Sequence, residues 1–300
     1  MSADPFPAGA MGSSTTTTST YAVSYYPGCS ADGTGVEYDL SARAVCEALG
    51  IELRELHDWT CCGASSAHAL DDFVGLALPA RNLSLAESAG LDLVVPCAAC
   101  FNRLRGAAHR MAGDGGTIPA GVTPYAGRVA VRHLLEFLAA GAPLEALRSA
   151  AKRGLGGLPV VPYYGCLTVR PAEVTGAPDA EDPTDLDRIL GALGADVRRW
   201  PYKTRCCGAA LTLPRSDVVA DLCGEIVSMA RRAGAEAIVV ACPLCFMNLD
   251  RQPRAAGEAP VPVFYFTELA GLAMDLPAAR KWLPKHLVDP RPVLAGRGIE

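Results

Sequence analysis

The chain has 300 residues, half of them apolar, and a formal net charge of −5. A chain of this length can bury two cores of roughly 100–150 residues each, so two domains are expected. Lysine and arginine form no basic run, which argues against a nucleic-acid partner. The apolar runs are shorter than the roughly 20 residues of a spanning helix, so no direct membrane insertion is expected.

Residues 1–20 have neither the basic and apolar regions of a secretory signal nor the arginine-rich pattern of a transit peptide. We expect them to form a disordered N-terminal tail. We also expect the protein to be cytoplasmic, or peripheral at a membrane through partners. In a reducing compartment, its twelve cysteines would serve as metal ligands or catalytic thiols rather than as structural disulfides.

Each half of the chain begins with a short β-rich run that leads into a Gly-Cys pair. The first run covers 21–26 and precedes Cys29, and the second covers 160–164 and precedes Cys166. Glycine and proline border both runs, as they usually border strands. The first cysteine of each half is therefore predicted to follow a strand.

A helix and a second strand are expected next in each half. Apolar spacing predicts helices at roughly 36–49 and 185–193, and each is followed by a glycine suited to a helix C-terminus. The second strands are predicted at 51–57 and 195–201. Each of them leads toward a Cys-Cys-Gly sequence.

The third strand of each half is predicted to deliver a Cys-x-x-Cys sequence. Helical spacing at 71–89 and 216–233 is followed by continuous apolar runs at 91–95 and 235–240, typical of strands covered on both faces. This alternation predicts an α/β fold with a small, largely parallel sheet flanked by helices in each half. Cysteines at the carboxyl ends of such strands would gather in the crevice where cofactors bind.

The cysteines repeat between the halves. A shift of 145 residues superimposes the last four cysteines of one half on those of the other, whereas the first cysteine needs a shift of 137. The first cysteine set is Cys29, Cys61, Cys62, Cys97 and Cys100, and the second cysteine set is Cys166, Cys206, Cys207, Cys242 and Cys245. An eight-residue insertion near 175–186 explains the difference. We therefore predict duplicated domains at 21–150 and 151–300, related by pseudo-two-fold symmetry.

Two cysteines, Cys46 and Cys223, have no counterpart under this shift. Both fall in predicted helices, and cysteine is often buried as a small apolar residue. We expect both to pack in the core.

Five cysteines per half favour an iron-sulfur cluster over other cysteine chemistry. A structural zinc ion takes four ligands, and adjacent cysteines fit one tetrahedron badly. A disulfide framework is disfavoured by the odd number and by the strain of bonding Cys61 to Cys62. Iron-sulfur clusters take thiolates at several irons. Gly63 and Gly208 would let the backbone approach the cluster or adopt positive φ, or would mark a simple turn.

The two motifs, Cys29…Cys61-Cys62-Gly63…Cys97-x-x-Cys100 and Cys166…Cys206-Cys207-Gly208…Cys242-x-x-Cys245, resemble the CCG-domain family, and most closely the B-type subunit of heterodisulfide reductase. The likeness covers residues 21–300. The resemblance implies one non-cubane 4Fe-4S cluster at each cysteine set, with a disulfide substrate cleaved between the two clusters. It further implies electrons from a ferredoxin-like iron-sulfur partner, the C-type subunit, with a flavin partner, the A-type subunit, upstream.

Three functions remain open on this resemblance. The first is an enzyme, an oxidoreductase acting on a disulfide or thiol small molecule within a heterodisulfide-reductase-like complex. The second is an electron-relay component of a quinone-linked succinate or lactate oxidoreductase. The third is sulfur oxidation, which runs the same thiol–disulfide chemistry in reverse.

Charged residues and histidines near the Cys-Cys pairs are weaker candidates. His57 and His68 flank the first pair and could donate a proton, although a surface or packing role is the ordinary expectation. Lys203 and Arg205 precede the second pair and could hold an anionic group, with a solvated surface charge as the default.

Overall fold

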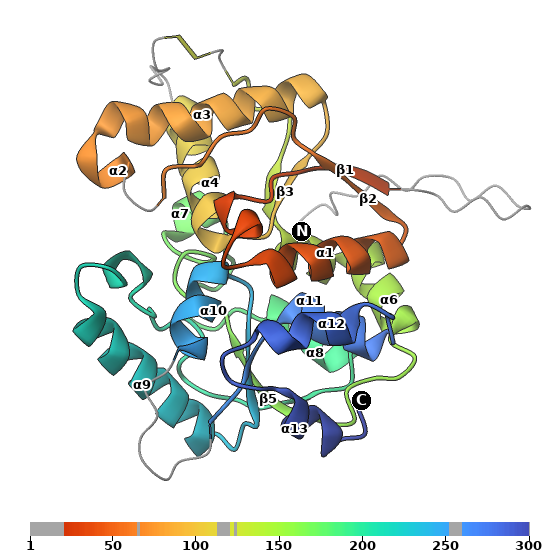
Figure 1. Cartoon of the computed structure of the whole chain (residues 1–300). Coiled ribbons are helices and arrows are strands. Elements are labelled where there is room, and N and C mark those ends of the chain that lie inside the picture. The colour runs from red at the N-terminus through yellow and green to blue at the C-terminus, as the bar shows by residue number, and fades with distance from the viewer. Residues whose placement is uncertain (1–20, 65–66, 113–120, 123–124, 252–259, 300) are drawn as a thin grey trace, which may run out of the picture.

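The computed structural model describes residues 21–64, 67–112, 121–122, 125–251 and 260–299. The predicted tail at 1–20 lies outside the described residues. Within them the chain forms two four-stranded sheets, one in each half, stacked one above the other in Figure 1. Every strand pairing in both sheets is parallel.

The two sheets share one topology. The first has the order β2-β1-β3-β4 and the second the order β6-β5-β7-β8. The strands are β1 Tyr21–Tyr25, β2 Ile51–Glu55, β3 Leu93–Val95, β4 Val131–His133, β5 Pro159–Tyr163, β6 Asp196–Val197, β7 Ala237–Val240 and β8 Val263–Tyr265. This repetition confirms the predicted α/β fold with duplicated, parallel-sheet units.

The helices lie where the spacing of apolar residues placed them, with several short additions. The predicted helices are α1 Val36–Ala48 and α3 Asp72–Ala89 in the first half, and α8 Asp185–Ala192 and α9 Ser216–Arg232 in the second. Two more long helices, α4 Ala98–Ala112 and α10 Pro243–Asp250, begin within the Cys-x-x-Cys sequences. The others are α2 Ala67–Leu70, α5 Leu134–Ala139, α6 Gly141–Ala150, α7 Ala172–Thr175, α11 Phe266–Ala273, α12 Ala279–Trp282 and α13 Arg291–Ala295, with 3₁₀ turns η1 Cys29–Asp32, η2 Ala209–Leu211 and η3 Leu283–Lys285.

Both faces of the first sheet are covered, as the continuous apolar strands require. Along β3, Leu93 and Val95 pack in a cluster with α3 and α4, whereas Val94 faces a second cluster that includes α1 and α5. In Figure 1, α3 lies on the outer side of the first half and α9 on the outer side of the second. The larger core cluster continues from the first sheet into the second.

The two halves meet through two pairs of helices, which the pseudo-two-fold symmetry relates to each other. Helix α1 of the first half packs on α11 of the second, and α5 of the first packs on α8 of the second. Tyr38 stacks on Tyr265 with ring centroids 4.3 Å apart, and Tyr265 stacks on Phe246 at 4.2 Å. Offset aromatic packing of this kind adds about 1 kcal/mol per pair beyond simple burial. The interface is therefore built like a core.

Helix α4 also reaches across to the second half. The Asn102 side-chain amide donates to the carbonyls of Leu167 (3.1 Å) and Arg170 (2.8 Å), and Arg105 Nε donates to Val174 O at 2.8 Å. The segment that these bonds hold follows Cys166 directly. The first half thus fixes the loop that carries the first cysteine of the second.

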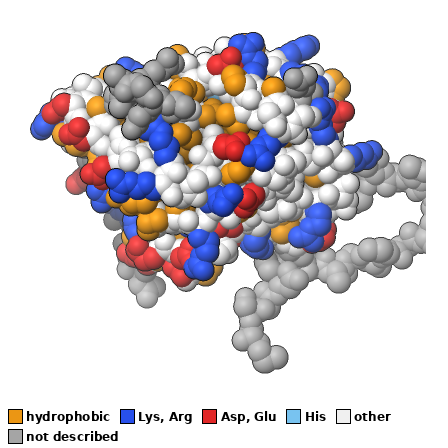
Figure 2. Space-filling model, turned by 90° about the horizontal axis from the view of Figure 1, so that it is seen from below, with side chains coloured by type: hydrophobic (Ala, Val, Ile, Leu, Met, Phe, Trp, Pro, Cys, Tyr) orange, Lys and Arg blue, Asp and Glu red, His pale blue; other side chains and the backbone are white. Residues whose placement is uncertain are grey.

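The outer surface carries many short-range ion pairs. On the face shown in Figure 2, basic and acidic side chains are interspersed. Among the ion pairs of the whole surface, Arg188–Asp185, Arg198–Asp196 and Arg291–Asp289 have N–O distances of 2.6 to 2.8 Å. Exposed pairs contribute at most about 1 kcal/mol each, so they do not determine the fold.

The sequence misplaced some strand boundaries. The second strand of the second half is only two residues long, because after Val197 the chain turns away through Trp200, whose indole N–H donates to Pro162 O. The fourth strands, β4 and β8, were not predicted. Each is three residues long and runs directly into a helix, so neither shows a period of two.

A buried acid–base pair closes the second half. His286 Nε2 and Glu268 Oε1 are 2.9 Å apart, and both side chains are fully buried. Glu268 also accepts from the backbone N–H of Tyr265 at the start of α11. Burial disfavours the charged imidazole, but Glu268, Asp250 and Glu37 outweigh it and raise the pKa of His286.

A raised histidine pKa makes stability depend on pH. The stabilisation from protonated His286 is fully present below about pH 6.5, its unfolded value, and is lost as pH rises through the higher folded value. We therefore expect His286→Gln to destabilise the protein most below about pH 6.5, by on the order of 3 kcal/mol, and less in alkaline buffer. Thermal unfolding of anaerobic wild type and variant across pH tests this, and a pH-independent difference would contradict it.

Candidate iron-sulfur centres

The cysteines lie at the carboxyl ends of the strands, at the point where strand order reverses. Cys29 follows β1 and Cys97 follows β3, and these neighbouring strands form the switch point of the first sheet. Cys166 and Cys242 follow β5 and β7 in the same way. In open α/β sheets this crevice is where ligands bind.

The Cys-Cys-Gly turns split their two thiols between different environments. Cys61 is exposed and Cys62 is buried. Gly63 has φ 75° and Gly208 has φ 78°, so both adopt positive φ, one of the roles that the sequence left open for them. The N–H of each glycine donates to the sulfur of the first cysteine of its pair, at 3.4 Å to Cys61 and 3.3 Å to Cys206. The turn therefore orients the exposed thiol.

Sulfur atoms from distant segments lie in contact within each set. The Sγ atoms of Cys62 and Cys100 are 3.3 Å apart, and those of Cys207 and Cys245 are 3.6 Å apart. Cys166 and Cys206 Sγ are separated by 3.8 Å. The buried members are Cys62, Cys97 and Cys100 in one set and Cys207, Cys242 and Cys245 in the other. Each set thus has a buried base and an open side.

The two sets adjoin at the centre of the molecule. Cys97 and Cys242, which are equivalent in the repeat, each affect the pKa of the other. A Cβ added at Gly35, in the first half, would lie 3.0 Å from the Cβ of Pro243, which follows Cys242. Tyr38 Oη donates to the carbonyl of Ala241 at 3.3 Å. His133 lies nearby, and burial lowers its pKa to about 4, so this imidazole is neutral near pH 7.

The crowded thiols share protons. Hydrogen bonds from Cys100 and Cys61 lower the pKa of Cys62 to about 3, and the contact with Cys62 raises the pKa of Cys100. A hydrogen bond from Cys166 likewise lowers the pKa of Cys206 to about 6. Thiolates this close repel one another unless cations neutralise them. A cluster with several irons meets that need.

The space around the sulfurs fits a close-packed thiolate cage. A Cβ at Gly28 would lie 3.0 Å from Cys100 Sγ, and a Cβ at Gly165 would lie 3.0 Å from Cys245 Sγ. Both glycines have positive φ, 76° and 70°. Among the described residues, no group of three or more Cys, His, Asp or Glu side chains surrounds a single-ion position. The donors of each cysteine set fit an iron-sulfur cluster, which that set would hold.

A tyrosine supports each set, and sequence reasoning missed both. Tyr26 Oη donates to the carbonyl of Thr60 at 2.7 Å, and Tyr163 Oη donates to that of Arg205 at 2.5 Å. Each accepting carbonyl directly precedes a Cys-Cys pair. Burial, followed by the nearby cysteines, raises the pKa of Tyr26 and of Tyr163. The repeat of a tyrosine three residues before Cys29 and Cys166 was the available signal.

Most of the histidines and basic residues near the Cys-Cys pairs make surface, packing or ion-pair contacts. His57 is exposed, and His68 Nδ1 lies 3.4 Å from Gly63 O. Lys203 was expected at the surface, but it is buried and pairs with Asp182 and Asp187 at 2.7 and 2.9 Å. Arg205 pairs with Glu225 at 3.0 Å.

The two cysteines without a counterpart in the repeat are buried, as expected. Burial raises the pKa of Cys46 to about 12. Cys223 is also buried, but its thiol lies 3.7 Å from Cys207 O, so it borders the second set.

Two parallel-sheet units with repeated cysteine sets at their switch points define a tandem cysteine-rich α/β protein. The family model described as "Cysteine-rich domain", CCG, matches residues 23–105 and 160–250. The chain therefore belongs to the CCG family. These cysteine-rich repeats, together with relatives named as parts of reductases, identify an iron-sulfur oxidoreductase type of protein involved in electron transfer.

Named relatives match nearly the whole chain. A protein of Archaeoglobus profundus, named as similar to the B-type subunit of heterodisulfide reductase, is 30% identical, with 82% of this chain and 88% of the relative covered. The B-type subunit of the ferredoxin/F(420)H(2)-dependent CoB-CoM heterodisulfide reductase of Methanosarcina acetivorans is 28% identical, with 84% and 89% covered. These matches confirm the predicted resemblance to the B-type subunit and make the relatives parts of multi-subunit complexes.

A third relative carries a different name. The 8-methylmenaquinol:fumarate reductase membrane anchor subunit of Wolinella succinogenes is 34% identical, with 88% of this chain and 96% of the relative covered. In the described parts of this chain, no helix combines the length and apolar character needed to cross a membrane.

A solved structure shares the fold. The crystal structure of a hypothetical protein from Helicobacter pylori aligns with a TM-score of 0.66 at 11% identity, covering 89% of this chain. This chain spans about half of that protein, 52% of its length.

The glycines beside the cysteine sulfurs provide a test of the cage. We expect Gly28→Ala and Gly165→Ala to lower iron content per chain after anaerobic purification, because the added methyl group would clash with Cys100 or Cys245. Gly90→Ala is the matched control, since Gly90 has φ 72° but nothing within 4 Å of its added Cβ. It should cost about 1 kcal/mol of stability with full iron. Equal iron loss in all three variants would contradict the cage.

Proposed function

We propose that this chain is the catalytic component of a heterodisulfide-reductase-like complex. It reduces, or reversibly forms, a disulfide between two non-cubane 4Fe-4S clusters with electrons from a partner iron-sulfur protein. The ligands of one cluster are the first cysteine set, Cys29, Cys61, Cys62, Cys97 and Cys100. Those of the other are the second cysteine set, Cys166, Cys206, Cys207, Cys242 and Cys245. Gly63 and Gly208 form the turns beside them.

One observation carries this proposal: the two cysteine sets adjoin, since Tyr38, in the helix that follows Cys29, donates to the carbonyl of Ala241, next to Cys242, at 3.3 Å. Both sets also keep an open side, since Cys29, Cys61 and Cys206 are exposed. A disulfide held between the two sets would face both of them. Centres that serve only electron transfer have no need of exposed cysteine ligands.

The stoichiometry of disulfide reduction suits two such centres. Cleaving one S–S bond into two thiols consumes two electrons and two protons. When bound, iron-sulfur clusters supply electrons one at a time. The chain's own part is to hold the two sets side by side, to orient Cys61 and Cys206 through glycine N–H groups, and to leave the substrate face open to water, the source of protons.

The proposal extends to partners and location. A ferredoxin-like partner, the C-type subunit, would deliver electrons, with a flavin partner, the A-type subunit, upstream. The complex would be cytoplasmic or peripheral at a membrane through its partners. The domain boundary is proposed between 150 and 151, in the segment that joins α6 to β5.

A second candidate is favoured by the relative named as part of an 8-methylmenaquinol:fumarate reductase. In that case the two centres relay electrons within a quinone-linked succinate or lactate type of oxidoreductase. Sulfur oxidation is the third possibility and uses the same disulfide site in the opposite direction.

A reoxidation experiment separates the first two functions. The anaerobic protein is reduced and the reductant removed, and a small disulfide or a soluble quinone analogue is then added. Disulfide reductase activity predicts reoxidation of the iron-sulfur absorbance with two thiols formed per disulfide. Reoxidation by the quinone alone, with no thiol formed, would contradict the proposal and favour the relay.

A further inference from the structure

We propose that Asn248 is a positioning residue that raises the reduction potential of the second iron-sulfur centre above the value its cysteines alone would give. The inference rests on the proposed function, because it requires a cluster at the second cysteine set. It adds a residue outside both sets, and it makes the two centres unequal.

Asn248 contacts the buried cysteine of the second Cys-Cys pair directly. The residue lies on α10, one turn after Cys245, and is 4% exposed. Its Nδ2 is 3.3 Å from Cys207 O and 3.8 Å from Cys207 Sγ. One side-chain amide therefore reaches both the carbonyl and the sulfur of a single proposed ligand.

The surroundings fix which end of the amide faces the cysteine. A carbonyl oxygen and a ligand thiolate can only accept hydrogen bonds, so Nδ2 must point toward Cys207. Oδ1 then faces Thr212, whose Oγ1 is 3.0 Å away. The same hydroxyl lies 2.9 Å from Ala209 O, so its proton is shared between two acceptors. Thr212 thus holds the amide in the orientation that aims its N–H at the sulfur.

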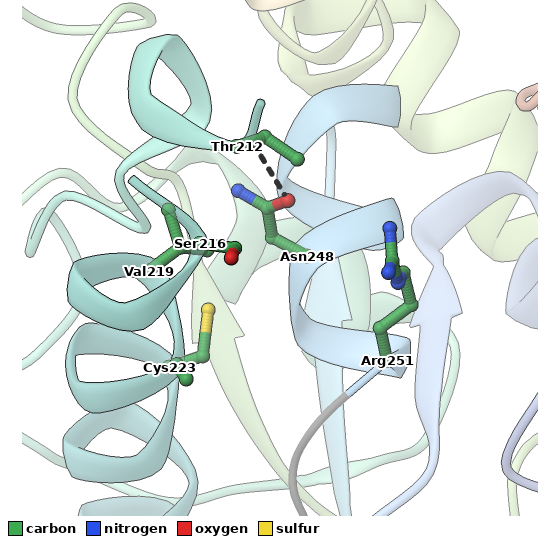
Figure 3. Close-up of a pocket in the computed structure, with 7 residues that line it drawn as sticks. Thr212, Ser216, Val219, Cys223, Asn248 and Arg251 are labelled. Atoms are coloured by element: carbon green, nitrogen blue, oxygen red, sulfur yellow. Dashed lines mark hydrogen bonds between the residues drawn. The ribbon is translucent and has the colours of Figure 1, made fainter. Parts of the chain in front are cut away.

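Figure 3 shows how three elements bring these groups together. Asn248 extends from α10 toward Thr212, which follows η2, and Cys223 lies below them on α9. The groups border a cavity of about 180 Å³, which is also lined by Ser216, Val219 and Arg251. The cavity leaves room beside the amide, so an apolar side chain of similar size can replace Asn248 without a clash.

The first half has different chemistry at the equivalent position. A shift of 145 residues places Arg103 opposite Asn248. Arg103 is partly buried; burial lowers the pKa of its guanidinium, and the nearby Cys62 charge opposes that effect. Cys223 also has no counterpart: Leu78 packs under Gly63 as Leu222 packs under Gly208, which places Pro79 opposite Cys223. The repeat is therefore broken on the side of the buried ligand.

The physical effect of the amide follows from charge. Reduction adds negative charge to a cluster and its thiolates, and hydrogen bonds to ligand sulfurs stabilise that charge. An N–H aimed at a buried sulfur acts in a low dielectric, where the interaction is stronger than in water. Asn248 therefore favours the reduced state of the second centre and raises its potential.

The test is an anaerobic redox titration of the full chain, followed by electron paramagnetic resonance and absorbance, with iron counted in each sample. Asn248→Leu should lower one midpoint potential and leave the other unchanged. Asn248→Asp should lower the same potential further, because it places an anion beside the sulfur. Thr212→Val should lower it less, because the amide stays but loses its orientation.

Two variants serve as controls. Met247→Leu changes the neighbouring residue of α10 and should move neither potential. Arg103→Leu should move the other potential, which assigns the two signals to the two halves. If Asn248→Leu and Arg103→Leu shifted the same signal, the assignment of Asn248 to the second centre would be wrong.

The outcomes separate this inference from the proposed function. If the wild-type protein held no iron, both the proposed function and the role of Asn248 would be ruled out. Full iron with unchanged potentials in Asn248→Leu and Asn248→Asp would overturn the role of Asn248 alone. If Asn248→Leu failed to load iron, Thr212→Val would decide, and an unchanged potential in that iron-loaded variant would also overturn it.

Discussion

The close approach of cysteine sulfurs in the two cysteine sets is the constraint on which the rest of the structure depends. Sγ atoms 3.3 and 3.6 Å apart cannot all carry charge without neutralising cations. The glycines before Cys29 and Cys166 keep the backbone near those sulfurs, and Tyr26 and Tyr163 hold the carbonyls before the Cys-Cys pairs. Each of these features helps to place the thiols.

The parallel sheet explains why such distant residues can meet. The strand order 2-1-3-4 brings the ends of β1 and β3 together, and the same order recurs in the second half. Packing of α1 on α11 and of α5 on α8 then brings the two halves together. The duplication therefore does more than repeat a cysteine set, because it places a second set beside the first. Asn248 opposite Arg103 indicates that the two partners have since diverged.

Much of this could be predicted from the sequence. The spacing of Cys61, Cys62, Cys97 and Cys100 against their counterparts indicated the duplication, and continuous apolar runs indicated strands covered on both sides. The spacing could not predict tertiary contacts. The placement of Cys97 near Cys242 depends on how helices of the two halves pack, and the role proposed for Asn248 depends on hydrogen bonds that link separate elements. Lys203 was expected at the surface but is buried. The sequence did not show that it pairs with Asp182, from the insertion, and with Asp187, from the following helix.

The count of iron and acid-labile sulfide per chain, on anaerobically purified protein, tests the central claim most directly. Two 4Fe-4S centres predict about eight irons and eight sulfides. Replacing Cys62 or Cys207 with serine should remove about half of each. Zinc in place of iron, or no iron after anaerobic reconstitution, would contradict the assignment of the ten cysteines as cluster ligands.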